Sequence, residues 1–154
     1  YSCCSGKSEI VGEEFWKSDR YYADYASRNR RRYQGPEEKL RAFTRAQMRY
    51  VRDEVGNDSL KILYVNQTIQ RGGDKVIVNP DRQWYRIVSG VIAEGQEAGV
   101  FRTDADAGAL AYGFNRSMRS VFLDWCITDA AFDLVKEGLA HLDTWLLPAL
   151  RARR

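Results

Sequence analysis

The residues of this chain that could do chemistry are aromatic rings and side-chain amides, and the chemistry they offer is non-covalent binding. Nine tyrosines, six phenylalanines and four tryptophans are present, and many of them recur at helical spacing. The amides of Gln47, Gln67 and Asn115 lie close to the same apolar stripes. Burying an unpaired amide costs on the order of a few kcal/mol. These amides therefore indicate either a cavity that holds a polar guest or pairing inside an ordinary core.

Taken by themselves, the residues favour plain core, because most aromatic stripes on helices are core. The side chains that could instead converge on a ligand pocket come from segments spread over most of the chain. They are Tyr22, Tyr25, Phe43, Gln47, Tyr64, Gln67, Trp84, Ile87, Val91, Phe114 and Met118.

Catalysis has little support in the sequence. The only histidine, His141, lies on an apolar stripe, where we expect a packed or interfacial side chain. The chain has no Glu-x-x-His motif and no phosphate-cradling glycine loop, and its carboxylates are scattered over polar faces. We therefore expect no enzyme activity, no catalytic residue, no metal site and no cofactor.

Composition narrows the setting of the protein. The three cysteines include no C-x-x-C pair, which favours reduced thiols in a cytoplasmic protein. No apolar run approaches the roughly 18 residues of a membrane span, and no signal peptide opens the chain. A net charge of +3 does not by itself indicate nucleic-acid binding. Because the chain begins at Tyr1 rather than at a methionine, we expect it to be a piece of a longer protein.

The elements that must position these side chains are helices. Apolar periodicity and breaking residues predict helices over about 8–30, 36–55, 58–70, 80–98, 104–127 and 130–147. Asn79 and Thr103 are expected helix caps, Gly99 an expected helix end, and Pro148 an expected stop or kink. We expect 75–78 to be an extended linker, because no partner strand is available. The sequence therefore predicts an all-α fold of about six helices.

The last two predicted helices are apolar on more than one side. A helix of this kind is buried on two sides, and a second copy of the chain is the simplest cover for the extra side. Two helices from each copy would form an intermolecular four-helix bundle. The alternative is that the extra side packs within the same chain. The residues expected at the dimer interface are Phe122, Trp125, Leu134, Gly138, His141 and Trp145.

Two passages resemble TetR-family transcriptional regulators. The first, Tyr1-Ser-Cys-Cys-Ser-Gly-Lys7-Ser-Glu-Ile10, is similar to the end of the family's helix-turn-helix region and the start of its connecting helix. Cys3 and Cys4 depart from the family's usual His-Phe at this point. The second, Glu94-Gly-Gln-Glu-Ala-Gly-Val-Phe-Arg-Thr-Asp104, is similar to the start of the dimerising half. The resemblance covers the whole chain.

The resemblance implies a division of the chain and a function. It implies that 1–7 are a remnant of the DNA-binding domain, with Tyr1 and Lys7 on DNA phosphates, and that 8–154 form the ligand-binding and dimerisation domain. It also implies that the 11 side chains listed above as possible pocket residues do line a ligand pocket. The implied function is a homodimeric, ligand-responsive repressor that binds operator DNA through missing N-terminal helices, with an unknown small-molecule effector and no membrane. The alternatives are a stand-alone helical carrier of small molecules and a purely structural dimerisation module, neither with a DNA role.

Overall fold

The secondary structure of the chain is helical, which confirms the predicted all-α fold. The structure is a computed structural model that describes residues 3–73 and 75–153. Its helices are α1 (Cys3–Asn29), α2 (Pro36–Tyr50), α3 (Asn57–Ile69), α4 (Gln83–Glu97), α5 (Ala107–Ile127), α6 (Leu134–His141) and α7 (Leu147–Leu150). One π-helical turn, Val51–Val55, extends α2, and another, Leu142–Leu146, joins α6 to α7. None of the described helices combines the length and the hydropathy needed to span a bilayer.

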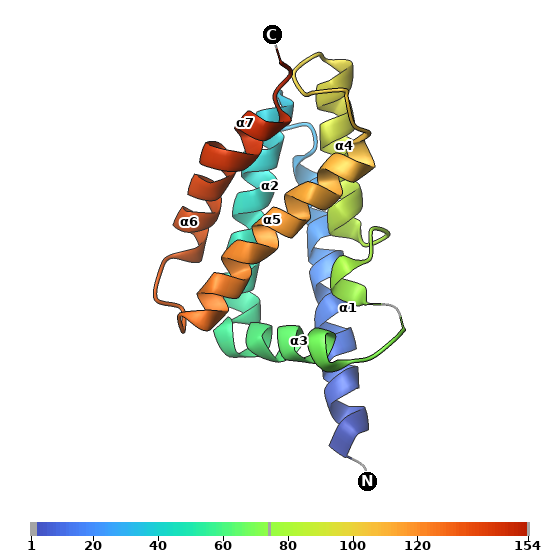
Figure 1. The fold of residues 1–154 in the computed structure, drawn as a ribbon, viewed down its shortest axis with the longest axis vertical. Helices are drawn as coiled ribbons and strands as arrows, with labels where there is room; N and C mark the ends of the chain where they lie inside the picture. The colour runs from blue at the N-terminus through green and yellow to red at the C-terminus, as the bar shows by residue number, and fades with distance from the viewer. Residues whose placement is uncertain (1–2, 74, 154) are drawn as a thin grey trace.

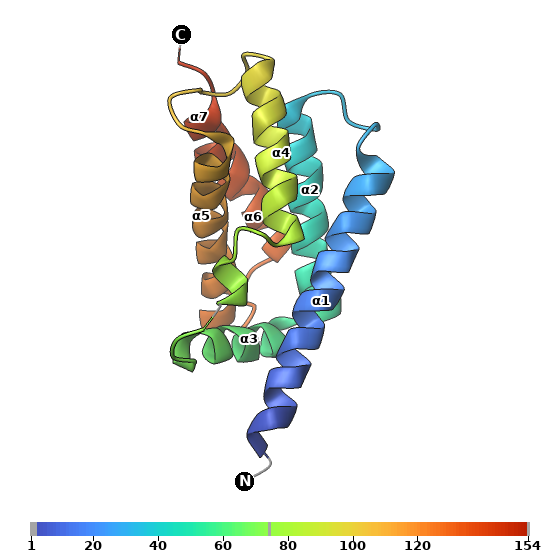
Figure 2. The same ribbon diagram turned by 90° about the vertical axis from the view of Figure 1, so that its right-hand side faces the viewer.

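The helices pack around α2 and α4, and α1 reaches beyond them. Figure 1 shows α5 crossing the molecule obliquely, with α6 and α7 beside α2. The most extensive contacts join α4 to α5, α2 to α6 and α1 to α4. In both views the N-terminal part of α1 projects past α3, which runs crosswise at the same end of the molecule (Figures 1 and 2).

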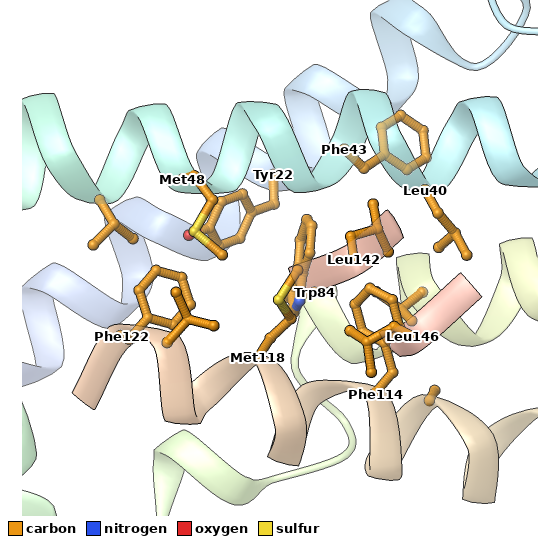
Figure 3. Packing of buried hydrophobic residues seen from close by; sticks show 14 of the residues in the cluster. Tyr22, Leu40, Phe43, Met48, Trp84, Phe114, Met118, Phe122, Leu142 and Leu146 are labelled. Atoms are coloured by element: carbon orange, nitrogen blue, oxygen red, sulfur yellow. The ribbon is translucent and has the colours of Figure 1, made fainter. Parts of the chain in front are cut away.

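One apolar core joins all the helices. Figure 3 shows buried side chains from facing helices meeting there. Leu40 and Met48 of α2, Trp84 of α4 and Met118 of α5 are each at least nine-tenths buried. Met48 fits against Gly138 of α6, where an added Cβ would lie 2.7 Å from the methionine side chain. The core therefore relies on close approach of α6 to α2.

Gly99 ends α4 as predicted, with a φ of 70°, and the chain turns back on itself there. The backbone N–H groups of Val100 and Phe101 donate to the carbonyl of Gly95 at 2.8 and 3.0 Å. The Phe101 ring, 1% exposed, fills the space over Gly95, where an added Cβ would lie 2.1 Å from it. Gly95 is thus required by packing, and Gly99 by backbone conformation.

The predicted caps on either side of α4 are wrong. Asn79 closes a tight turn, in which its Oδ1 accepts from the N–H of Asp81 at 2.9 Å, and α4 begins only at Gln83. Thr103 is not the cap of α5: Asp106 is, and its carboxylate accepts from the N–H of Ala109 at 2.9 Å. Tertiary bonds hold Thr103 outside the helix, because Gln96 Nε2 donates to the carbonyls on both sides of it, those of residues 102 and 105.

The segments before α4 and α6 also differ from expectation. Residues 76–78 form one 3₁₀ turn rather than an extended linker. α6 begins at Leu134, capped by Asp133, because Asp129 and Ala130 adopt positive φ and end the preceding turn. Pro148 does not stop the helix, which continues to Leu150. The π-helical turn ends two residues before this proline, which has no N–H for an ordinary helical bond.

The packing of Phe101 on Gly95 predicts a sharp difference between two glycines of α4. Gly95→Ala should lower the free energy of unfolding by about 1–3 kcal/mol, because its methyl group overlaps the Phe101 ring. Gly90→Ala on the same helix meets no atom within 4 Å and should raise it by about 0.5–1 kcal/mol. Urea unfolding of both variants measures the difference. Equal effects would show that Phe101 does not depend on Gly95.

Candidate ligand-binding site

A cavity of about 100 Å³ lies among the first five helices, and we call it the central cavity. Phe15, Ser18 and Tyr22 of α1 form one wall. The remaining lining side chains come from α2 to α5 and their connections. They are Gln47, Val51, Val55, Leu60, Leu63, Tyr64, Ile77, Arg82, Trp84, Tyr85, Asn115, Met118, Arg119 and Phe122.

The structure brings five of the predicted pocket residues to this cavity and places six elsewhere. Those that line it are Tyr22, Gln47, Tyr64, Trp84 and Met118. Phe43, Ile87 and Val91 line a separate hollow between α1, α2 and α4 instead. Tyr25 packs edge-on against Phe43, and Phe114 is enclosed in the core at 2% exposure. These residues share helix faces with the pocket residues but lie on other turns.

Gln67 is also outside the cavity, because its amide is used structurally. Its Oε1 accepts from the N–H of Ile77 at 3.1 Å, and its Nε2 donates to Asn66 at 3.1 Å. Asn115 has a similar role within the wall: its Oδ1 accepts from Trp84 Nε1 at 2.7 Å, and its Nδ2 donates to the carbonyl of Ala111. Gln67 and Asn115 are therefore amides paired inside a core, as one of the two interpretations of the sequence pattern predicts.

Gln47 is the exception among the buried amides. It is 8% exposed and lines the cavity, yet its Oε1 has no hydrogen-bond partner among the described residues. Buried polar atoms are nearly always paired, and an unmet acceptor costs about 1–3 kcal/mol. Thr44 Oγ1 is also unpaired, but Thr44 does not line the cavity. Gln47 therefore corresponds to the other interpretation, an amide that faces a site for a polar guest.

The cavity wall holds two arginines that sequence reasoning missed. Arg82 is neutralised by Asp19, with an N–O distance of 2.8 Å, and stacks over the Phe15 ring. Arg119 donates to the hydroxyl of Tyr85 at 2.9 Å, and no carboxylate of residues 3–73 or 75–153 lies within 4.0 Å of it. Arg119 follows Asn115 by four residues on α5, so extending the stripe by one position would have found it.

Burial keeps the cavity's tyrosines neutral. Desolvation raises the pKa of both Tyr22 and Tyr64 well above the usual range. Desolvation also raises the pKa of Tyr85, against the opposing effect of Arg119. Their hydroxyl groups are therefore uncharged donors and acceptors at physiological pH.

The predicted dimer-interface residues divide into two groups. Phe122, Trp125, Leu134 and Gly138 are buried by side chains of their own chain. For these four, the alternative that the second apolar side packs within the same chain describes the structure. Trp145 remains 66% exposed, and His141 is half-buried. The exposed apolar residues on this pair of helices also include Leu123 and Ile127 of α5.

His141 contacts a serine that the sequence could not place near it. Its Nε2 lies 2.7 Å from Ser117 Oγ on α5. Desolvation lowers the pKa of His141, which favours the neutral imidazole. No described carboxylate bonds to this histidine, so the orienting third member of a nucleophilic triad is missing from the part of the chain that the structure describes. Among the same residues, no group of three or more potential ligands gathers to hold a metal ion.

The predicted DNA contacts fall outside what the structure describes. Tyr1 lies outside the described residues, and Lys7 belongs to α1 but its side chain is not among those described. The predicted domain boundary between 7 and 8 falls within the continuous helix α1.

Comparison of the chain with protein-family models, with curated proteins and with solved structures finds no match.

The contrast between two buried glutamines gives a test of the site. Gln47→Leu removes an unmet acceptor together with the contact of its amide with Tyr22, so it should change the free energy of unfolding by less than about 1 kcal/mol in either direction. Gln67→Leu has the same change in shape but leaves the N–H of Ile77 unpaired, and it should lower that free energy by about 1–3 kcal/mol. Urea unfolding of the two variants checks this. A large loss of stability in Gln47→Leu would show that its amide is already paired in the free protein.

Proposed function

We propose that this chain is the ligand-binding and dimerisation part of a ligand-responsive, DNA-binding transcriptional regulator of the TetR type. One observation carries the proposal: the central cavity has a wall from α1, the helix whose N-terminal part projects beyond the rest of the fold (Figure 2). A guest in the cavity would touch the helix that, in the resemblance, leads to the DNA reader.

The contacts of α1 indicate how the cavity could control that helix. Tyr22 packs on Trp84 with ring centroids 5.0 Å apart, and Asp19 binds Arg82. Both partners lie in the cavity wall, so a guest that shifts them also shifts α1. A ligand changes such an equilibrium only if its affinity differs between the two orientations. Coupling of about 1–3 kcal/mol would change DNA affinity by about 5- to 150-fold.

The dimer is proposed on the α5–α6 face. Trp145, in the turn that follows α6, and Ile127, at the end of α5, are 66% and 68% exposed, and exposed large apolar side chains can mark an interaction site. A second copy related by a two-fold axis would cover them, and α5 and α6 of the two copies would form the four-helix bundle expected from the sequence. Half-site spacing on DNA would then follow from the dimer's geometry.

A stand-alone carrier of small molecules is the second candidate function. The central cavity supports it as well as it supports the regulator, and DNA binding separates the two. A dimerisation module with a filled core is less well supported, because it offers no hydrogen-bond partner for the buried Gln47 Oε1.

The regulator proposal predicts DNA binding that responds to a cavity ligand. The protein translated from the entire open reading frame should bind DNA from upstream of its gene, measured by fluorescence anisotropy. A compound selected by thermal shift should change that affinity at least about fivefold. Gln47→Leu should keep DNA binding and lose most of the response, while Gln70→Leu, the same change at an exposed position, should respond normally. Ligand binding with no DNA binding would favour the carrier.

The dimer proposal predicts that two exposed tryptophans behave differently. Trp145→Glu should convert the protein to monomers in sedimentation velocity at micromolar concentration, because it places a charge in the proposed interface. Trp16→Glu, on α1 and of similar exposure (59% against 66%), should leave the dimer intact. A wild-type protein that sediments as a folded monomer would reject the proposed dimer.

A further inference from the structure

Arg119 and Gln47 give the central cavity a polar character that a purely apolar guest would not match. We propose that the cavity binds a small apolar monocarboxylate, with its carboxylate at Arg119 and an O–H or N–H donor toward Gln47. This inference rests on the proposed function only in taking the central cavity as the ligand site.

The first step is the charge of the wall. Both arginines of the wall are permanently charged, because the guanidinium group is not deprotonated in proteins. Arg82 is balanced by Asp19, whereas Arg119 has no carboxylate within 4.0 Å among residues 3–73 and 75–153. On the described residues, the wall therefore has an excess of one positive charge. A partly buried unpaired charge is unfavourable, and a monoanionic guest would relieve it.

The second step is that the neighbouring tyrosines cannot supply the missing charge. Arg119 donates to the Tyr85 hydroxyl and lines the same cavity as Tyr64, and its positive charge favours a lower pKa for both phenols. Desolvation outweighs this effect and raises the pKa of both hydroxyls, so neither is a phenolate counter-ion. The neutral Tyr64 hydroxyl can instead donate to a carboxylate, whereas the Tyr85 hydroxyl already donates to the carbonyl of Ile77 at 3.5 Å. The guanidinium uses only Nη2 toward Tyr85, so N–H groups remain for the paired bonds that carboxylates accept.

The third step is the second polar group of the guest. Gln47 Oε1 is an acceptor with no hydrogen-bond partner among the described residues, so an O–H or N–H of the guest can donate to it. The rest of the wall is mainly apolar and aromatic, with Phe15, Leu63 and Phe122 among its residues. A ring or short chain with a carboxylate and one donor matches this distribution.

The last step is size. The cavity volume of about 100 Å³ is of the same order as the engineered cavity of about 150 Å³ that accepts benzene. It is well below the roughly 300–1,000 Å³ of pockets for drug-sized ligands. The guest is therefore a single-ring or short-chain acid rather than a multi-ring compound.

The test uses four single-ring probes of similar size on the whole chain in isothermal titration calorimetry. They are 4-hydroxybenzoate, its methyl ester, 4-hydroxybenzyl alcohol and benzoate. The first should bind at least about tenfold more tightly than the ester and the alcohol, which lack the charge. It should also bind more tightly than benzoate, which lacks the donor, and Gln47→Leu should remove only this second preference.

Variants of α5 assign the charge preference to one residue. Arg119→Gln should reduce 4-hydroxybenzoate affinity at least about tenfold and leave the neutral probes within about twofold, while Arg119→Lys should retain part of the preference. Arg116→Gln, an exposed arginine on the same helix, should change nothing. Thermal melts establish that each variant is folded.

Either of two kinds of result overturns the inference: binding that does not depend on the charge, or no binding. If the ester or alcohol binds as tightly as the acid, or if Arg119→Gln keeps the preference for the acid, the ligand class is wrong and the cavity remains a ligand site for neutral compounds. If none of the four probes binds, the ligand class is also rejected. The DNA-response experiment, with its own compound selection, still decides the proposed function in either case.

Discussion

The indole of Trp84 is the contact on which the arrangement of the helices depends. Its ring packs on Tyr22 of α1, its N–H donates to Asn115 of α5, and its own helix, α4, lies between them. A buried indole N–H needs an acceptor, and Asn115 is held in position by its second bond to the carbonyl of Ala111. One side chain therefore positions α4 against α5 through a polar contact and against α1 through an aromatic contact. The central cavity is the space that remains beside it.

The wall of the cavity contains polar groups that an apolar core would not need. An interior packed only for stability would replace Gln47 with an apolar side chain, because an unmet acceptor lowers the free energy of unfolding. Arg82 has a structural role, because its ion pair with Asp19 attaches α1 to the cavity wall. An unmet polar group at the cavity, with paired polar groups around it, is what the proposed role of the cavity in binding would require, because a binding site gives up some stability.

Local signals allowed the helices to be predicted, but tertiary contacts decided their ends. Pro36 and Gly99 mark helix boundaries whose backbone requirements lie within a few residues, and both were read correctly. Thr103 was read wrongly, because the amide of Gln96 on the preceding helix holds its segment outside α5. Leu134 and Gly138 were predicted to be interfacial, since nothing near them in sequence shows that both are buried within the chain, Gly138 against Met48. The pocket was half predicted for the same reason: periodicity gives the face of a residue but not which turn of another helix lies opposite.

The position of the cavity relative to α1 has a mechanical consequence. Phe15, Ser18 and Tyr22 occupy the middle of the 27-residue helix, with its N-terminal part projecting to one side (Figure 1). Tyr21 stacks on Tyr50 at 4.4 Å, which ties the same section of α1 to α2. A rigid helix held at its middle turns a small displacement there into a larger one at its far end. A guest too small to reshape the core can thus still move the N-terminal end of α1, which is what control of a distant reader requires.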